Sequence, residues 1–241
     1  MIDYRKRLYA NYFSTHVLHR KGRATIEEFR SRSFGYQKRF GRFLPEEKSS
    51  MVIDVGCGNG SVAWWLQQFG FRNAEGIDIS PEQIEEGQRL GVKNIKKGDA
   101  VEYLRDRKGF YDVIFLRDIL EHFKKDEIME ILDVCFQSLK DKGRIIIQTP
   151  NAESPFFGRI RYGDFTHEIA FSVSSLLQLL KNAGYNEVQF CSYGPIVVGI
   201  KSMIRYTLWK IIEACYKACI SIEVGRGKRI VTQNIIATGT K

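Results

Sequence analysis

Val52-Ile-Asp-Val-Gly-Cys-Gly-Asn-Gly60 runs directly into Ser61-Val-Ala-Trp-Trp-Leu66, and this stretch decides the fold. Its first residues form a short apolar run typical of a buried strand, and its last residues have the apolar content of a packed helix. The glycines between them let the main chain turn tightly and let a ligand lie against bare backbone. The stretch therefore predicts a strand, a ligand-binding loop and a helix in succession.

Further short apolar or β-branched runs follow, separated by segments of helical period. They lie at 74–79, 94–97, 111–116 and 143–149, and two more strands are expected at 187–192 and 229–238. Ser80-Pro81 opens one of the helices as an N-cap with proline in the first position. Another helix is expected at 173–182 and ends before Gly184. This order predicts an α/β fold with a doubly wound, mostly parallel seven-stranded sheet.

A chain of 241 residues suits a single domain with one core. We expect a helical N-terminal cap at 1–48, a ligand-binding core at 49–192, and an amphipathic helix with the final strand at 193–241. A loop of about twenty residues after Pro150 is long for a compact domain, and such loops are usually functional.

The formal net charge of +9 is concentrated at the two ends of the sequence. Residues 1–42 hold 11 Lys and Arg against 3 Asp and Glu, and residues 201–241 hold 8 against 2. Basic ends favour an anionic partner, which could be a phosphate-bearing substrate, an anionic membrane surface or nucleic acid. A solvated cationic face without a specific partner explains the charge equally well. No nucleic-acid recognition motif is present, so a nucleic-acid-binding module is the more remote reading.

The five cysteines form neither a Cys-x-x-Cys pair nor an even disulfide framework, which is typical of reduced thiols in a cytoplasmic protein. The first residues show no signal-peptide pattern. Cysteine and histidine are sparse and scattered, so no metal is expected.

Two carboxylates indicate which ligand the glycine loop binds. Asp78 ends the second strand about twenty residues after the loop, where a carboxylate can accept both ribose hydroxyls of an adenosine. Asp54 lies inside the first strand, where a buried acid must order the loop or face a cation. Ser61 replaces the last glycine of a dinucleotide fingerprint, and the Gly-Lys-Ser/Thr of a P-loop is missing. The spacing suits an adenosine ligand with a positive centre and no pyrophosphate.

Several motifs in order carry a family resemblance over about 49–192: Asp54-Val-Gly-Cys-Gly-Asn-Gly60, Gly76-Ile-Asp-Ile-Ser80, Lys97-Gly-Asp-Ala100, Tyr111-Asp-Val-Ile-Phe-Leu-Arg-Asp-Ile-Leu-Glu-His122 and Gly143-Arg-Ile-Ile-Ile-Gln-Thr-Pro-Asn151. In these motifs the chain resembles the class I S-adenosylmethionine-dependent methyltransferases. The resemblance implies their Rossmann-like fold, an enzyme that transfers methyl groups, and S-adenosylmethionine as its cofactor.

By that resemblance, the glycine loop would support the aminocarboxypropyl end of the cofactor, Asp78 the ribose, and Ile79 one face of adenine. Asp99 and Ala100 would meet the adenine amino edge, and the end of the fourth strand would lie near the sulfonium. The candidate cofactor residues are therefore Asp54, Gly56, Cys57, Gly58, Gly60, Asp78, Ile79, Asp99, Ala100, Leu116, Arg117 and Asp118.

The acceptor chemistry is expected in the loop after the fifth strand. Methyl transfer from a sulfonium needs positioning of the acceptor, with a base added when the acceptor is a weakly acidic hydroxyl. His167 is the first candidate base, and Asp164 could orient it. His122 is a second candidate base, although it could instead cap a helix or fill a polar gap in the packing.

The Asp-x-Thr-His element at 164–167 resembles a branch of the family associated with polysaccharide and other glycan biosynthesis. That resemblance implies O-methylation of a sugar-containing or otherwise anionic small molecule. A quinone-like or aromatic acceptor is the alternative, and it predicts a pocket lined by Tyr and Phe from residues 1–42. Shared fold does not fix the substrate.

An amphipathic basic helix is expected at 196–223. Its apolar face could rest on a membrane, which would make the protein cytoplasmic but peripheral to the bilayer. It could also pack on its own domain or on a second subunit of a homodimer.

Overall fold

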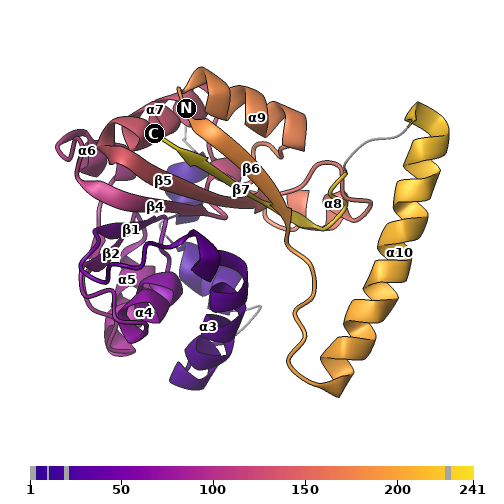
Figure 1. Cartoon of the computed structure of the whole chain (residues 1–241). Helices are drawn as coiled ribbons and strands as arrows, with labels where there is room; N and C mark the ends of the chain where they lie inside the picture. The colour runs from indigo at the N-terminus through magenta and orange to yellow at the C-terminus, as the bar shows by residue number, and fades with distance from the viewer. Residues whose placement is uncertain (1–3, 10, 19–21, 226–228) are drawn as a thin grey trace.

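The computed structural model describes residues 4–9, 11–18, 22–225 and 229–241. These residues form one seven-stranded sheet, covered by helices, with a long helix standing off to one side (Figure 1). The strands lie in the order β3-β2-β1-β4-β5-β7-β6. Their bounds are β1 Val52–Val55, β2 Ala74–Asp78, β3 Ile95–Lys97, β4 Tyr111–Arg117, β5 Leu139–Pro150, β6 Asn186–Ser192 and β7 Asn234–Thr240.

The sheet is mostly parallel, as the alternation of strands and helices predicts. Strands β1 to β5 run parallel to one another. Strand β7 runs antiparallel to both of its neighbours, β5 and β6. The carboxyl ends of β1, β2, β4 and β5 therefore meet at one edge of the sheet. This is the edge at which α/β proteins bind ligands.

The helices α4 Ser61–Gln68, α5 Pro81–Arg89, α6 Ala100–Arg105, α7 Lys125–Ser138 and α9 Val173–Asn182 connect the strands. Helix α3, Ile26–Phe40, begins at Thr25, whose side chain accepts a hydrogen bond from Glu28 N. Its Phe40 packs with Trp65 of α4 on the sheet residue Phe115. The larger core cluster lies among α6, α7, α9 and the sheet.

Short elements surround the ligand-binding edge. Helix α1, Tyr4–Tyr9, and the π-helical segment η1, Phe13–Val17, precede α3, and the 3-10 segments η2, Gly41–Phe43, and η3, Leu120–His122, follow α3 and β4. The expected long loop after Pro150 contains the short helix α8, Phe157–Arg161.

Several boundaries differ from the sequence-based expectation, and β5 begins at Leu139 instead of Gly143. Strand β7 begins at Asn234 instead of Arg229, because its ladder with β5 starts where Asn234 pairs with Pro150. The last long helix, α10, spans Ile200–Val224, and Ser202 Oγ accepts hydrogen bonds from the main chain just before it. Parts of the predicted cap and final segment, residues 1–3, 10, 19–21 and 226–228, lie outside the described residues.

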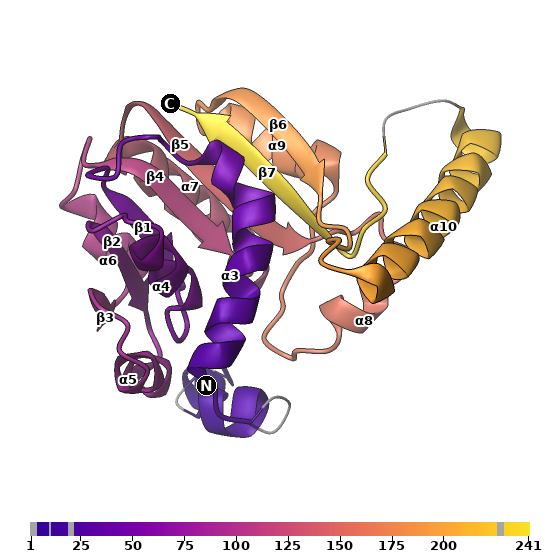
Figure 2. The ribbon, with the colours of Figure 1, turned by 60° about the horizontal axis from the view of Figure 1, so that its bottom comes forward.

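Helix α10 lies beside α8, away from the sheet, in both views (Figures 1 and 2). Phe156, at the start of α8, contacts the rings of Trp209 and Tyr216 on α10. Among the helices that the structure describes, none is both long and apolar enough to cross a membrane.

Candidate functional site

The glycine loop between β1 and α4 exposes main chain at the ligand-binding edge. Gly56, Gly58 and Gly60 all have positive φ angles, of 69°, 54° and 75°. The amide groups of Gly56 and Cys57 donate to Ile77 O at 2.8 and 3.0 Å, which fixes the start of the loop on β2. A Cβ atom built on Gly58 would find no atom closer than 3.8 Å. The loop therefore presents open backbone, as the sequence predicts.

Asp78, at the end of β2, holds this loop in place. Its Oδ2 accepts a hydrogen bond of 2.7 Å from Gly58 N, and its Oδ1 accepts one of 2.8 Å from Ser80 N. Burial raises the pKa of the carboxyl group, and the two backbone bonds oppose that shift. Asp78 therefore ties β2 to the glycine loop, a role that spacing alone did not reveal, and its contact with a ribose stays a prediction.

Asp54 is a buried acid that has no hydrogen-bond partner among the described residues and interacts with the charge of Arg117. It is 1% exposed. Burial raises its pKa to about 7, although Arg117 lowers it, and Asp78 and Asp118 raise it further. A buried carboxylate of this kind is costly unless a cation pairs with it. Asp54 therefore suits a ligand that brings a positive group.

The remaining predicted cofactor residues differ in what they offer. Ile79 is 54% exposed and presents an apolar surface just after β2, as contact with a flat ring requires. Asp99 caps α6, since its Oδ1 accepts a bond of 3.0 Å from Glu102 N, and Ala100 begins that helix. Cys57 and Leu116 bury their side chains, so only their main chain is available to a ligand.

Arg117 and Asp118 end β4 in the middle of the edge. The guanidinium of Arg117 lies 3.3 Å from Asp118 Oδ2 and 5.3 Å from the centre of the Tyr36 ring. Asp118 has a φ angle of 54°, and both of its oxygens accept from Gln148 Nε2 at 2.8 Å. Asp118 also lines a neighbouring cavity.

The cavity, of about 330 Å³, lies beside Asp118. Segments far apart in the sequence form it: the N-terminal cap, the ends of β4 and η3, and the loop around α8. Its lining residues are Tyr12, His16, Asp118, His122, Arg159, Ile160, Gly163, Asp164, His167 and Gln233. All three predicted acceptor-site residues, His122, Asp164 and His167, therefore come together here.

Asp164 is the best-connected group in this cavity. It accepts from the Thr166 hydroxyl at 2.6 Å, from Thr166 N at 2.9 Å and from the Tyr12 hydroxyl at 2.5 Å. His16 Nε2 lies 3.5 Å away. Burial alone would raise its pKa, but these hydrogen bonds outweigh burial and lower it to about 2. The group is therefore ionised at neutral pH.

Asp164 also fixes the proton on His122. The single hydroxyl hydrogen of Thr166 is donated to Asp164, so Thr166 Oγ1 must accept the bond of 2.9 Å from His122 Nδ1. The proton of the neutral ring therefore lies on Nδ1, which leaves a lone pair on Nε2. Burial, followed by the charge of His167, lowers the pKa of His122 to about 4, so the ring is neutral at pH 7.

His167 has the same tautomer for a different reason. Its Nδ1 lies 3.1 Å from the carbonyl oxygen of Ile160, which can only accept, so Nδ1 carries the proton. Burial lowers the pKa of His167, while the charge of Asp164 opposes that shift. Two neutral imidazole rings thus line the cavity, each with an unprotonated Nε2.

The sequence model described as "Methyltransferase domain" matches residues 26–189, more than half of the chain. The chain belongs to this methyltransferase family. Its seven-stranded fold and glycine loop agree with that membership, and the enzyme is an S-adenosylmethionine-dependent methyltransferase.

Several known proteins are similar to this methyltransferase. A ubiquinone biosynthesis O-methyltransferase of Shewanella pealeana is 25% identical over 187 residues, which cover 68% of this chain and 74% of the relative. One of Xylella fastidiosa is 31% identical over 105 residues, 42% of each chain. A solved methyltransferase of Archaeoglobus fulgidus superposes with a TM-score of 0.64 at 23% identity, over 89% of this chain and 97% of the other.

These relatives confirm the enzyme class and the fold but not the finer expectation. None of these similar proteins is named for glycan biosynthesis, so the resemblance to that branch has no support here. The match also spans less than half the length of the Xylella relative. The acceptor therefore has to be argued from the site itself.

The residues present fit the cofactor of this family. The main chain at Gly58 is open, the Ile79 side chain is an exposed apolar surface, and the buried Asp54 carboxylate beneath this edge has no hydrogen bond among the described residues. An adenosyl group joined to an amino acid and a sulfonium needs these three features.

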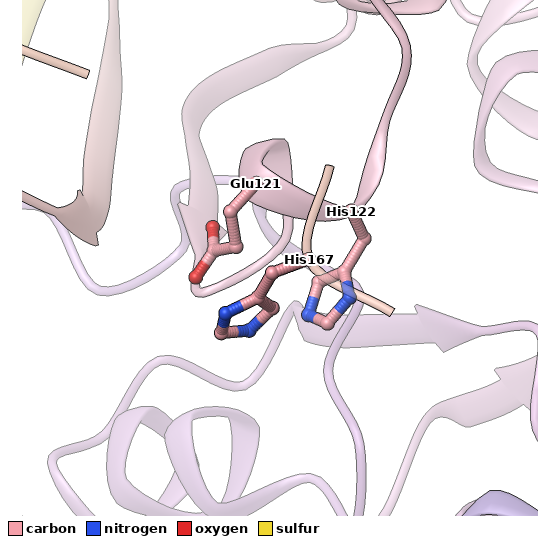
Figure 3. A group of neighbouring side chains, drawn as sticks. All are labelled: Glu121, His122 and His167. Carbon is pink, nitrogen blue, oxygen red and sulfur yellow. The ribbon is translucent and has the colours of Figure 1, made fainter. Parts of the chain in front are cut away.

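Glu121, His122 and His167 converge next to the cavity (Figure 3). Each offers one possible ligand atom, and these atoms lie within 4.8 Å of one another. Two imidazoles and a carboxylate can hold a divalent transition metal. Burial, however, raises the pKa of Glu121 well above its usual range, so this group would have to ionise first. The sequence-based expectation of no metal overlooked this convergence, because the two histidines are far apart in the chain.

Other important residues escaped the sequence analysis. Thr166, which connects Asp164 with His122, lies inside the Asp-x-Thr-His element but was given no role. Tyr12 is one of the tyrosines of residues 1–42 that the quinone-like alternative places in the pocket, but the sequence identifies neither Tyr12 nor Arg159 individually. The local signal for Thr166 was present, whereas only the fold brings Tyr12 to Asp164.

Proposed function

We propose that this methyltransferase transfers the methyl group to a hydroxyl oxygen of a phenol-type acceptor in the cavity, and that His167 takes the hydroxyl proton. The observation that carries the proposal is the unprotonated Nε2 on each of two neutral histidines lining one cavity. A base must have its lone pair free and face the proton that it removes.

The cofactor supplies a methyl group on a positively charged sulfur, and the residues around it act by positioning. Asp54 would pair with the ammonium group of the cofactor, and Gly58 would lie against it with open main chain. Asp78 keeps that loop fixed on β2. His167 Nε2 would take the proton of the acceptor hydroxyl while that oxygen receives the methyl group that the bound cofactor would supply, the sulfur keeping the electrons of the bond it gives up.

Asp164 supports His167 in two ways. Its negative charge favours the imidazolium that forms when His167 takes the proton, since opposite charges nearby stabilise the charged form. It also holds Thr166 and thereby the adjacent ring of His122, which packs against His167 with ring centres 4.7 Å apart. The two rings therefore keep one arrangement.

The acidity of the acceptor follows from the strength of this base. The pKa of both histidines is lowered, so neither is strong enough to remove a proton easily from an ordinary alcohol. A phenol loses its proton near pH 10, as tyrosine does, and is a better match. The similarity to ubiquinone biosynthesis O-methyltransferases supports the same class of acceptor.

An anionic, sugar-containing acceptor is the second candidate, because the basic residue Arg159 is among those that line the cavity. An acceptor panel separates the two: simple catechols and phenols, the same compounds carrying a carboxylate, and nucleotide-linked sugars. Methyl transfer from radiolabelled S-adenosylmethionine to phenols supports the proposal. Transfer confined to the sugars would refute it.

His167→Asn tests the base directly, and its amide can still donate to the Ile160 carbonyl. We expect kcat to fall by about 10² to 10⁴, as for loss of a general base, while the Kd for S-adenosylmethionine stays unchanged. The matched variant His16→Asn changes a histidine in the same cavity that has no assigned proton transfer, and it should retain most activity. Equal losses in the two variants would argue against His167 as the base.

A further inference from the structure

Helix α10 contacts the rest of the protein through its polar and aromatic side. Trp209 and Tyr216 pack on Phe156, and Glu213 is 5% exposed. Glu213 accepts hydrogen bonds of 2.8 Å from both Lys210 and Lys217. These contacts fix the rotation of the helix about its axis.

The opposite side of α10 is apolar, and it faces outward. At 100° per residue, positions 200, 204, 208, 211, 215, 218 and 222 fall within one arc of the helix. This outer face consists of Ile200, Ile204, Leu208, Ile211, Cys215, Ala218 and Ile222, all of them exposed. Ile211 is 58% exposed and Ile222 is 87% exposed.

This orientation is the reverse of that in an ordinary surface helix, which turns its apolar stripe to the core. The sequence-based option that this face packs on its own domain is therefore wrong. A contiguous apolar face in water marks a surface that something else covers. The outer face is accordingly an interaction surface.

Cations flank the outer face on both sides. Lys201 and Arg205 follow one edge of the arc, and Lys210 and Lys217 lie toward the other, with all four heads reaching solvent. On the inner side of α10, opposite the outer face, a groove of about 280 Å³ is lined by Lys38, Arg39 and Arg42 of α3 and its end, together with Trp209 and Glu213. Buried Arg39 Nε has no hydrogen bond among the described residues. The outer face is thus bordered by four cations, of which Lys210 and Lys217 share the carboxylate of Glu213 and Lys201 and Arg205 lie on the other edge.

We propose that α10 docks this protein on an anionic lipid surface, with the outer face among the first carbons of the acyl chains and the flanking cations at the headgroups. Helices of this composition lie in the plane of the interface, and Lys and Arg extend their charged ends to the headgroups. The charge decides between a membrane and a second copy of the chain. Each α10 carries Lys201, Arg205, Lys210 and Lys217 against Glu213 and Glu223, so two copies packed along this face would bring two net positive charges together.

The helix that carries the docking surface lies next to the acceptor cavity, with the outer face on its far side. Helix α8 contacts α10 through Phe156, and Arg159 and Ile160 of α8 line the cavity. Docking by α10 would therefore bring the cavity close to the lipid surface. This step rests on the proposed function, and it implies an acceptor that resides at the interface.

Vesicle flotation tests docking with the whole protein and without any acceptor. We expect the protein to float with vesicles of phosphatidylcholine and phosphatidylglycerol in a 7:3 ratio, and to bind pure phosphatidylcholine vesicles at least tenfold more weakly. The double variant Leu208→Glu/Ile211→Glu should lose at least tenfold in affinity for the anionic vesicles. Phe69→Glu, at an exposed apolar residue at the end of α4 and outside α10, is the matched control and should bind like the parent.

Methyl transfer to a small water-soluble phenol separates this inference from the proposed function. The double variant should retain that activity, since neither residue lines the cavity, and its thermal unfolding should match that of the parent. Absence of flotation, or equal flotation of the double variant, would overturn the proposal. So would a concentration-dependent dimer in sedimentation velocity that the double variant abolishes while vesicles have no effect.

The exposed thiols of Cys215 and Cys219 give an independent reading. A polarity-sensitive fluorophore on Cys215, in a Cys191→Ser/Cys219→Ser background, should shift its emission to shorter wavelength with anionic vesicles. An unchanged spectrum under conditions where the protein floats would place the contact elsewhere and refute docking through the outer face.

Discussion

The carboxylate of Asp164 determines which nitrogen of His122 carries the proton, although the two side chains are not bonded to each other. The hydroxyl of Thr166 connects them, by donating 2.6 Å to Asp164 and accepting 2.9 Å from His122. Mutating a group that hydrogen-bonds to a functional histidine and orients its ring commonly lowers activity or metal affinity 10- to 100-fold.

Asp164→Asn should therefore slow methyl transfer about 10- to 100-fold. The asparagine oxygen would keep both bonds from Thr166, but its amide nitrogen would face the Tyr12 hydroxyl, and the negative charge that favours an imidazolium on His167 would be lost. Isothermal titration should give an unchanged Kd for S-adenosylmethionine, because Asp164 does not touch the glycine loop. A matching loss of cofactor affinity would instead indicate a disturbed fold.

Acid should destabilise the protein through the same carboxylate. The pKa of Asp164 is about 2 in the folded protein and near 3.8 in the unfolded chain, so its ionisation stabilises the fold above pH 4. This contribution, about 2 kcal/mol, disappears as the pH falls from 4 to 2. Urea unfolding at each pH should show a shallower decline for Asp164→Asn than for the parent. Parallel curves would mean that the carboxylate is not tightly held.

Cofactor affinity should rise with pH through Asp54. Its pKa of about 7 means that much of the group is protonated at pH 6, and only the carboxylate can pair with the ammonium of the cofactor. Affinity should therefore increase by up to about tenfold per pH unit below 7 and level off above it, with release of a proton on binding. Calorimetry in buffers of different ionisation enthalpy measures that proton. Asp54→Asn should bind weakly, with no such dependence on pH.

Two glycines provide a matched test of the glycine loop as a cofactor-binding surface. Gly58 and Gly91 both have positive φ angles, of 54° and 76°, and neither has an atom within 3.4 Å of an added Cβ. Replacing either with alanine should cost about 1 kcal/mol in stability, because both conformations are strained for a side chain. Only Gly58→Ala should lose cofactor affinity, as its methyl group enters the ligand surface. Loss in both variants would point to a general effect of strain.

Chelation tests the convergence of Glu121, His122 and His167. With His167 acting as a base, prolonged dialysis against EDTA should leave the rate of methyl transfer unchanged, and added Zn²⁺ should inhibit by occupying the histidines. A rate that falls on dialysis and returns with one divalent ion per chain would assign these residues to a metal instead.

The sequence predicted the core of this enzyme well because its signals are local. The glycine loop, the Ser80-Pro81 cap and the helix at Val173–Asn182 depend on backbone geometry and periodicity within short windows. The boundary of β7 was less accurate because pairing with β5, and not the apolar run itself, determines where the strand begins. Periodicity also identifies the apolar arc of α10, but it does not show whether that arc faces the core or the solvent.

The site was predicted in part for the same reason. His122, Asp164 and His167 stand out as residue types, but their tautomers depend on Thr166 and on the carbonyl of Ile160, which only the folded chain brings into contact. Asp54 stands out in the sequence as a costly buried acid, because it interrupts an apolar strand. The tie from Asp78 to Gly58, in contrast, depends on how β2 pairs with β1.

The position of β7 imposes an order on folding. It follows all the other strands in the chain, yet it lies between β5 and β6, and β6 pairs with no other strand. During synthesis, the backbone N–H and C=O groups of β6 therefore stay unpaired until the segment beyond α10 has emerged. An unpaired strand edge of this kind can pair with other chains. The same late strand supplies Asn234, which donates to Asp118, so the catalytic edge is among the last parts of the molecule to be completed.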